Sequence, residues 1–259
     1  MQVLGKKAMR AGHAGLIVAF CLAVASPLKA DVNADAKADV ASGWQAYLEG
    51  DYTTALGQLT PASEAGNAAA QYYLGVLYSH GEGVARNYQT AALWYAKSAA
   101  QGHTDAQFNL GLLYYGGSGA PGLSTSVERD PETAALWFEQ AADGGHAMAA
   151  YLLCQLIHEG RVLEREPDQA LALCRSAAES GIAGAQFNTG LMLAERSNET
   201  AIWREAYAWF LLAKRANYPG AAQNLEAVSR HLDAAEIDEA EAAADAWLPR
   251  VAKPAASTS

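Results

Sequence analysis

The sequence repeats itself with a period of about 36 residues. Within the stretch 68–102, Gly75 lies in the first half and Trp94 in the second. Aligning the later stretches places Gly111, Gln155 and Gly190 opposite the glycine, and Trp137, Leu173 and Trp209 opposite the tryptophan. A period of this length, built from two helix-length halves, is typical of stacked helical hairpins. The sequence therefore predicts an all-α fold, an α/α solenoid (superhelix) of helix hairpins, and favours a binding function.

The glycines of one copy indicate packing and turns. Gly75 lies inside a helix-length apolar pattern, where glycine costs about 1 kcal/mol relative to alanine. Its recurrence predicts that two helix backbones approach closely there. Gly81 and Gly83 follow, and glycine readily adopts the left-handed conformation that ends a helix. A phosphate-binding loop would also need a following Lys-Ser/Thr, which is absent after these glycines.

This motif resembles the Sel-one-like repeat family, short relatives of the tetratricopeptide repeats. The resemblance is carried by Ala70-Gln71, Leu74-Gly75, Leu77-Tyr78, Gly81-x-Gly83-Val84, Asn87-Tyr88, Ala91, Trp94-Tyr95, Lys97, Ala99 and Gln101-Gly102. Weaker copies extend over most of the chain. The resemblance implies a helical repeat scaffold that binds other proteins.

The expected organisation has four parts. Residues 1–30 are expected to be a signal peptide, 31–42 a flexible leader, 43–248 the repeat array and 249–259 a disordered tail. The array divides into a partial copy at 43–66, copies at 68–103, 104–146, 147–182 and 183–220, and capping helices at 221–248. An insertion at 116–129 is rich in glycine and serine and is expected to be an exposed, mobile loop. Whether this insertion is functional or neutral stays open.

The N-terminal segment predicts export. Lys6, Lys7 and Arg10 precede an apolar run at 11–25, which small residues follow. This arrangement is typical of a secretory signal peptide, and the run is too short for a spanning helix. We expect cleavage after Ala30, with Ala25 as the alternative. The mature protein is then periplasmic or secreted, without stable membrane insertion.

The charge disfavours two classes of partner. The chain has 18 basic and 28 acidic residues, and removing the four basic residues of 1–30 leaves 14 and 28, a net charge of −14. Such a surface repels nucleic acid phosphates and anionic lipid headgroups. Nucleic acid is therefore not an expected partner.

Two cysteines of the expected mature chain, Cys154 and Cys174, fall in the same copy. Each lies about six residues from the turn of the predicted hairpin, so the two are level with each other. An exported protein with such a pair is expected to form a disulfide, although spacing alone does not show that the Cβ atoms face each other. Two buried thiols, or redox or metal chemistry, remain the alternatives.

No catalytic or metal-binding constellation is visible in the sequence. His103 and His146 occupy matching turns between copies, which indicates a structural role. The sequence has no His-x-x-x-His or Cys-x-x-Cys spacing, so we predict no metal site and no cofactor. A nucleophile elbow and a zinc-protease signature are also missing. We therefore predict a protein without catalytic residues.

Candidate binding residues follow from the resemblance to tetratricopeptide repeats. That resemblance implies that the residue two before the helix glycine points into the concave groove lined by the first helices. The candidates are Tyr73, Asn109, Leu153 and Asn188. Asparagine offers a donor and an acceptor to an extended peptide backbone. Its recurrence also fits repeat inheritance or a bond between neighbouring helices.

The leading hypothesis is an exported, non-catalytic scaffold or regulator that binds a protein or peptide partner in the cell envelope. One alternative is an enzyme, because some cysteine-rich relatives are linked to β-lactam binding or hydrolysis. Their cysteines recur in every repeat, however, whereas only one copy here has a pair. A second alternative is a glycan or peptidoglycan binder that uses Tyr72, Tyr73 and Phe108. The partner and the oligomeric state are not determined by the sequence.

Overall fold

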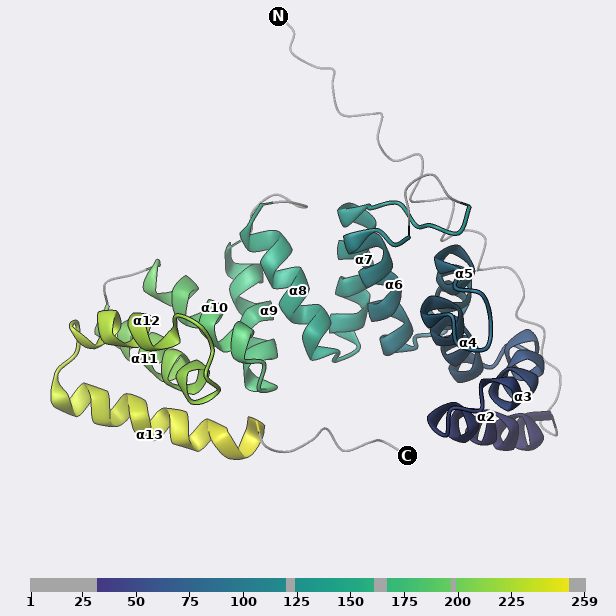
Figure 1. Ribbon diagram of the computed structural model, residues 1–259. Helices are drawn as coiled ribbons and strands as arrows, with labels where there is room; N and C mark the ends of the chain where they lie inside the picture. Colours follow the sequence, from purple (N-terminus) through teal and green to yellow (C-terminus); the bar gives the residue numbers. More distant parts are fainter. Residues whose placement is uncertain (1–31, 120–123, 161–166, 197–198, 252–259) are drawn as a thin grey trace, which may run out of the picture. The chain divides into compact units, whose positions relative to one another are not determined.

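A computed structural model describes residues 32–119, 124–160, 167–196 and 199–251 (Figure 1). Within these residues the regular elements are twelve α-helices, and consecutive helices pack in pairs as hairpins. The predicted all-α solenoid class is thereby confirmed for the described chain. The chain divides into two compact units, residues 1–137 and 138–259.

The N-terminal unit contains α2 to α6 and the first part of α7. Its helices are α2 (Val32–Leu48), α3 (Tyr52–Glu64), α4 (Ala68–His80), α5 (Tyr88–Ala99), α6 (Thr104–Gly116) and α7 (Pro131–Asp143). Helix α2 packs on α3, α3 on α4, α4 on α5, and α5 on α6. Each element therefore contacts its neighbour in the chain, as expected of a repeat array.

The C-terminal unit contains the remainder of α7 and six further helices. These are α8 (Ala147–His158), α9 (Pro167–Glu179), α10 (Ala183–Ala194), α11 (Thr200–Arg215), α12 (Ala221–Ser229) and α13 (Ala234–Val251). From α8 to α12 each helix packs on the next, while α13 lies along α11 and also contacts α9.

Both ends of the array differ from the expectation. Helix α2 begins at Val32, so the range 31–42 is not a flexible leader from that residue on. Its alanine-rich sequence favours a helix, and Val40 is buried in the first core cluster of the unit. Helix α13 continues to Val251, past the expected boundary at 248. The predicted signal peptide, 1–30, and residues 252–259 lie outside the described residues.

Side-chain caps fix where several helices begin. Asn67 Oδ1 accepts a hydrogen bond from the backbone N–H of Ala70 at 3.0 Å at the start of α4. His103 and His146 do the same through Nδ1, at 3.3 Å for α6 and 3.1 Å for α8. A capping acceptor satisfies an otherwise unpaired helical N–H. The two histidines therefore have the structural role that their repetition predicts.

The recurring glycine packs against an aromatic ring of its own hairpin. A Cβ atom placed on Gly75 would lie 2.6 Å from Cδ1 of Tyr95. One placed on Gly190 would lie 2.8 Å from Cε1 of Phe210. Both contacts are shorter than two carbon atoms tolerate, so only glycine allows the ring to lie against the first helix. The glycine therefore has the packing role that its recurrence predicts, but the atoms against it at these two positions belong to an aromatic side chain and not to a second helix backbone.

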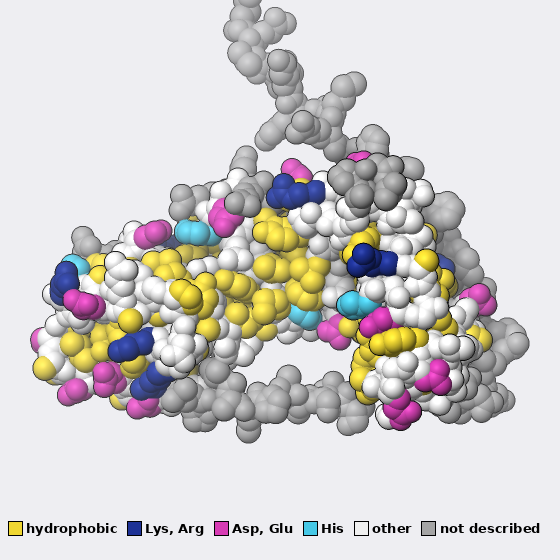
Figure 2. Space-filling view, in the orientation of Figure 1, with side chains coloured by type: hydrophobic (Ala, Val, Ile, Leu, Met, Phe, Trp, Pro, Cys, Tyr) yellow, Lys and Arg dark blue, Asp and Glu magenta, His cyan; other side chains and the backbone are white. Residues whose placement is uncertain are grey.

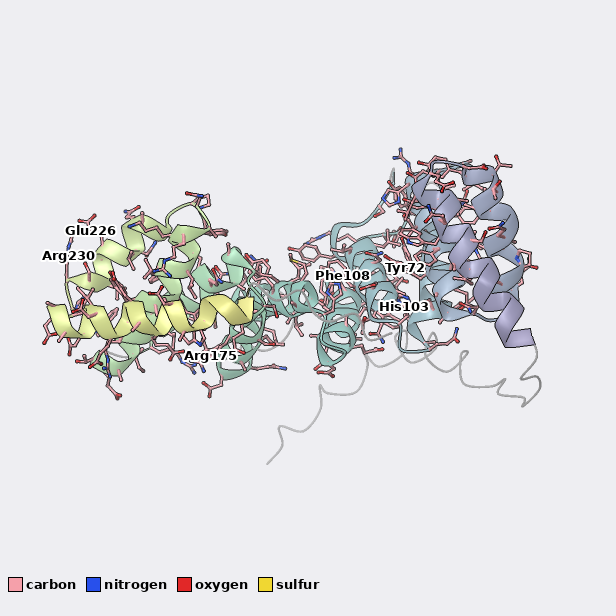
Figure 3. All side chains as sticks on the ribbon, turned by 90° about the horizontal axis from the view of Figure 1, so that it is seen from below. Tyr72, His103, Phe108, Arg175, Glu226 and Arg230 are labelled. Atoms are coloured by element: carbon pink, nitrogen blue, oxygen red, sulfur yellow. A yellow bond between two sulfur atoms is a disulfide. The ribbon has the colours of Figure 1, made fainter. Side chains whose placement is uncertain are left out.

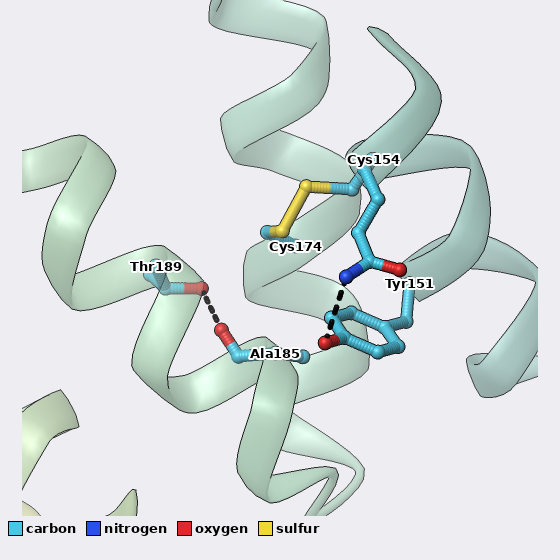
Figure 4. Close-up of a disulfide and its surroundings, with 6 residues drawn as sticks. Tyr151, Cys154, Cys174, Ala185 and Thr189 are labelled. Carbon is cyan, nitrogen blue, oxygen red and sulfur yellow. Dashed lines mark hydrogen bonds between the residues drawn. A yellow bond between two sulfur atoms is a disulfide. The ribbon is translucent and has the colours of Figure 1, made fainter. Parts of the chain in front are cut away.

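In the hairpin α8–α9 a disulfide takes the place of this glycine–ring contact. Counting from the helix starts places Cys154 at the position of Gly75, and Cys174 at that of Tyr95. Cys154 and Cys174 are joined, with their Cα atoms 5.5 Å apart (Figure 4), and both are fully buried. The alignment of Gln155 with the glycine was therefore wrong by one residue. Gln155 instead donates to the Tyr151 hydroxyl at 3.0 Å.

A row of glutamines connects successive repeats. Gln71, Gln107 and Gln186 are buried, and each donates from Nε2 to the carbonyl oxygen of the residue eight positions earlier, at 3.0, 3.2 and 3.3 Å. That carbonyl lies near the end of the preceding helix, where carbonyls lack helical partners. Helix α8 has Ala150 at this position and cannot make the bond. The hairpin α8–α9 therefore lacks both the glycine–ring contact and the glutamine hydrogen bond.

The insertion of the second repeat folds back onto the first. Ser118 and Val127 pair through two backbone hydrogen bonds of 2.8 Å. The Thr125 carbonyl accepts from the N–H groups of Tyr88 and Gln89, at 2.9 and 3.3 Å, at the start of α5. Ser126 is buried. The described part of 116–129 is therefore hydrogen-bonded to the array, contrary to the expected exposed, mobile loop.

Candidate partner-binding face

The four predicted contact residues have different environments. Tyr73 on α4 is half-buried, and its ring stacks on Trp44 of α2 with centroids 4.3 Å apart. Asn109 on α6 and Asn188 on α10 are also half-buried. Leu153 on α8 is only 2% exposed, so it belongs to the core and cannot contact a partner.

The error at Leu153 has the same origin as the misplaced glycine. With Cys154 at the glycine position, the residue two before it is Leu152, which is half-buried. Leu153 corresponds instead to Leu74 and Leu110, which are each 2% exposed. The structural equivalent of Tyr73 in α8 is therefore Leu152.

Asn109 interacts with two tyrosines of the preceding repeat. Its side chain hydrogen-bonds to the hydroxyls of Tyr72 and Tyr95. Burial raises the pKa of both phenols, and the bonds to Asn109 oppose that rise. A bond between neighbouring helices is one of the possibilities that the sequence left open, and the peptide contact predicted for Asn109 stays a prediction.

The helices α2, α4 and α6 bring a continuous group of aromatic rings together, which we call the aromatic face: Trp44, Tyr47, Tyr72, Tyr73 and His103. Trp44 also stacks on Tyr47, with centroids 4.8 Å apart. The centroids of Tyr73 and Tyr72 lie 5.2 Å apart, and Tyr72 stacks on His103 with centroids 4.7 Å apart. Figure 3, seen from below, labels Tyr72 and His103, which lie near each other. All five residues are half-buried, so each is packed and still reaches solvent.

Figure 2 shows hydrophobic side chains over the helices of this unit, with a histidine and both acidic and basic side chains near them. The rings come from two successive copies, 43–66 and 68–103, and occupy different sequence offsets. A periodic reading of the sequence isolates Tyr73 but misses Trp44, Tyr47 and His103. The density of aromatic residues in 44–73 is a signal that could have found Trp44 and Tyr47.

Two carboxylates act on the aromatic face. Glu82 Oε1 accepts from the Tyr52 hydroxyl at 3.3 Å, and its Oε2 is buried without a hydrogen-bond partner in the described residues. Burial, followed by the hydrogen bond and charge of Glu82, raises the pKa of Tyr47 to about 12. Burial and then the charge of Asp105 raise the pKa of Tyr72 and Tyr73. The face is therefore electronegative.

The C-terminal unit is organised differently, by ion pairs that hold its last helix. Arg204 of α11 pairs with Glu239 of α13, and Arg215 pairs with Asp245 at 2.7 Å. Trp209 stacks on Trp247, with centroids 4.0 Å apart. These contacts fasten α13 along α11, which fits the capping role expected for this region.

The structure also bears on membranes and metals. Among the described helices, none combines the length and the apolar character needed to cross a bilayer. Within the same residues, no group of three or more His, Cys, Asp or Glu side chains is arranged to hold a metal ion.

Comparisons with known proteins identify three repeats of one family in the chain. The family model "Sel1 repeat" matches residues 68–103, 104–146 and 147–182. No curated protein matches the sequence.

Two solved structures are similar along most of the chain. The protective antigen c5321 of uropathogenic Escherichia coli, which displays an SLR fold, is 28% identical with a TM-score of 0.67 over 85% of this chain. The chain spans about half of that protein, 47% of its length. A Sel1 repeat protein from Oxalobacter formigenes is 27% identical with a TM-score of 0.65, covering 82% of this chain and 84% of the other.

The glycine–ring hairpins, the three matched repeats and the two similar structures all indicate an array of Sel1-type helical hairpins. Sel1 repeat proteins are typically protein–protein interaction scaffolds. Residues 68–182 therefore contain three Sel1 repeats, and most of the chain is similar to solved Sel1 repeat proteins.

Proposed function

We propose that the protein is an exported, non-catalytic scaffold that binds a protein or peptide partner through the aromatic face. The observation that carries this proposal is the row of stacked, half-buried rings contributed by α2, α4 and α6. Aromatic residues are enriched at interface hot spots because they bury a large area at low entropic cost. A row of partly exposed aromatic rings therefore suits the binding of a protein partner.

Partner binding is tested by comparing two faces of the same unit. The variants Trp44→Ala and Tyr73→Ala truncate the aromatic face, whereas Leu93→Ala truncates an apolar side chain of α5 that is 66% exposed. Each tagged variant is used for quantitative affinity capture from the native cell after crosslinking. We expect one protein to be captured by wild type and Leu93→Ala and to be depleted about tenfold or more with the face variants.

Circular dichroism and a thermal melt accompany each capture, so that a variant that fails to fold is not counted as a loss of binding. Equal capture by folded Trp44→Ala and Tyr73→Ala would reject the aromatic face as the binding surface.

Export is supported by the basic and apolar pattern of 1–30 and by the disulfide, because disulfides persist mainly in oxidising compartments. The test is intact-mass analysis and N-terminal sequencing of the protein purified from its own cell. We expect a chain that begins at Asp31, or at Ser26, with both cysteines resistant to alkylation. An intact Met1 end together with alkylated cysteines would contradict export.

The absence of catalysis is tested with a chromogenic β-lactam, the substrate class of the competing hypothesis. We expect no turnover above the uncatalysed rate from the oxidised protein. Turnover that disappears in the Cys154→Ser/Cys174→Ser variant would establish an enzyme and end the scaffold proposal.

A further inference from the structure

Two acidic side chains lie at the two ends of the aromatic face. Glu82 accepts from the Tyr52 hydroxyl at 3.3 Å, and the ring of Tyr52 lies 5.7 Å from that of Tyr47. Asp105 lies in the first turn of α6, two residues after His103. The two acids act on different ends of the row: Glu82 on Tyr47 and Tyr52, and Asp105 on Tyr72, Tyr73 and His103. The face therefore presents rings and phenol oxygens between two negative groups.

Most of the charged side chains of this unit are acidic. Residues 32–137 contain ten acidic and four basic side chains. Lys97 lies over the ring of Trp94, with Nζ 3.8 Å from the centroid. Arg86 lies over Tyr88 at 5.7 Å, and Arg129 Nε donates to the Tyr115 carbonyl at 3.1 Å. Two cations of the unit thus already lie over aromatic rings, and acidic side chains outnumber basic ones in residues 32–137.

We propose that the aromatic face binds an arginine-bearing, positively charged segment of a partner protein. The inference rests on the proposed function and specifies the chemistry of its partner.

Arginine suits this surface better than other side chains for three reasons. Its planar guanidinium stacks on aromatic rings, where the electron-rich ring face attracts a cation. Its positive charge is attracted by the carboxylates of Glu82 and Asp105, and its N–H groups are donors for the phenol oxygens of the face. The opposite charges also steer the segment towards the acidic unit.

The experiment uses the full oxidised chain and a defined probe. The probe is a peptide with four Gly-Ser-Arg repeats and a neutral fluorophore, and binding is followed by fluorescence anisotropy. Matched peptides carry citrulline, lysine or glutamate in place of arginine. Citrulline keeps the shape and the hydrogen-bonding urea but removes the charge, so it isolates the contribution of the cation.

We expect the arginine peptide to bind about tenfold or more tightly than the citrulline peptide, and the glutamate peptide not to bind. The lysine peptide should bind less tightly than arginine. Asp105→Asn and Glu82→Gln should each weaken binding about twofold to fivefold. Glu64→Gln is the control, because it removes the same charge from an exposed site on α3 and should have a smaller effect.

Three results would overturn the inference: equal affinity for arginine and citrulline, equal affinity for arginine and lysine, or charge variants no weaker than Glu64→Gln. Failure of the inference is distinguishable from failure of the proposed function. If Trp44→Ala still loses the captured partner while no cationic peptide binds, the face binds a partner of other chemistry. If Trp44→Ala loses nothing, the proposed function itself is wrong.

Discussion

The hairpins α4–α5 and α8–α9 join two helices at the same place by different chemistry. In α4–α5, Gly75 leaves room for the ring of Tyr95, which is 3% exposed. In α8–α9, Cys154 and Cys174 fill the corresponding positions and are covalently bonded. The glycine–ring contact requires a residue without a side chain at position 75. The disulfide exists only while the two cysteines are oxidised.

This comparison shows that the same pair of repeat positions can join two helices with different residue types. Twenty residues separate the partners in all three cases: Gly75 and Tyr95, Gly190 and Phe210, and the two cysteines. The two kinds of contact are disrupted by different changes. The glycine–ring pair fails if the glycine gains volume, and the cysteine pair fails if it is reduced.

The largest expected effect is loss of the disulfide. Cys154→Ser/Cys174→Ser should lower the free energy of unfolding by about 3 kcal/mol, because the unfolded chain regains the freedom of the closed loop and two hydroxyls are buried. Denaturant unfolding with and without reductant measures it. The variant Cys154→Gly/Cys174→Phe should recover much of the loss and be insensitive to reductant. Wild-type stability in the serine variant would show that the bond contributes nothing.

Gly75→Ala should destabilise by about 1–3 kcal/mol, because the new methyl group would overlap the ring of Tyr95. This cost exceeds the gain of about 1 kcal/mol in helix propensity. The matched control is Gly57→Ala in α3, where nothing lies within 4 Å of the new Cβ. That variant should be stabilised. Stabilisation of both variants in denaturant titrations would mean that the ring moves freely and that packing does not require the glycine.

A smaller effect is expected from the glutamine row, which α8 lacks. Gln186→Ala should cost about 1 kcal/mol, since the buried amide that donates to the Ala178 carbonyl is removed. Gln169→Ala, at an exposed position of α9, should change stability by less than about 0.5 kcal/mol. Chemical denaturation compares the two variants. Equal effects would show that the hydrogen bond of Gln186 does not stabilise the stacking of repeats.

The smallest effect is a pH dependence from His103. Burial lowers its pKa below the ordinary 6.5, with Asp105 opposing the shift, and Nδ1 must stay unprotonated to cap α6. The folded state then binds fewer protons than the unfolded state. Its contribution is fully present above pH 6.5 and is lost as the pH falls from there through the lower folded pKa.

The variant His103→Asn keeps a capping acceptor and removes the titration. Between about pH 7.5 and about pH 5, its melting temperature should fall less than that of wild type. An identical fall in both proteins would assign the pH dependence to other groups.

The period of small and bulky residues was sufficient to predict helical hairpins, because each hairpin buries only the face that its neighbour covers. It was not sufficient to set the register of α8. Because α8 has no glycine at the recurring position, Gln155 was the apparent match, and the error moved the candidate contact from Leu152 to Leu153. The helix start set by His146 places the register correctly.

The aromatic face could be predicted only in part. Tyr73 follows from its offset, but the stacking of Trp44 on it joins α2 to α4, and a contact between repeats leaves no periodic signal. Asn109 was identified, yet its bonds to Tyr72 and Tyr95 depend on how two neighbouring hairpins pack. A sequence offset gives the side of a helix, whereas the neighbour decides what that side contacts.

The fold-back of the insertion limits how freely these repeats can be exchanged. The Thr125 carbonyl of the second repeat satisfies the first backbone amides of α5 in the first repeat. Cutting the chain at the boundary between copies, to shorten or shuffle the array, would separate the start of α5 from the carbonyl that accepts its hydrogen bonds. The first two repeats should therefore be handled as one inseparable module in any truncated version of this protein.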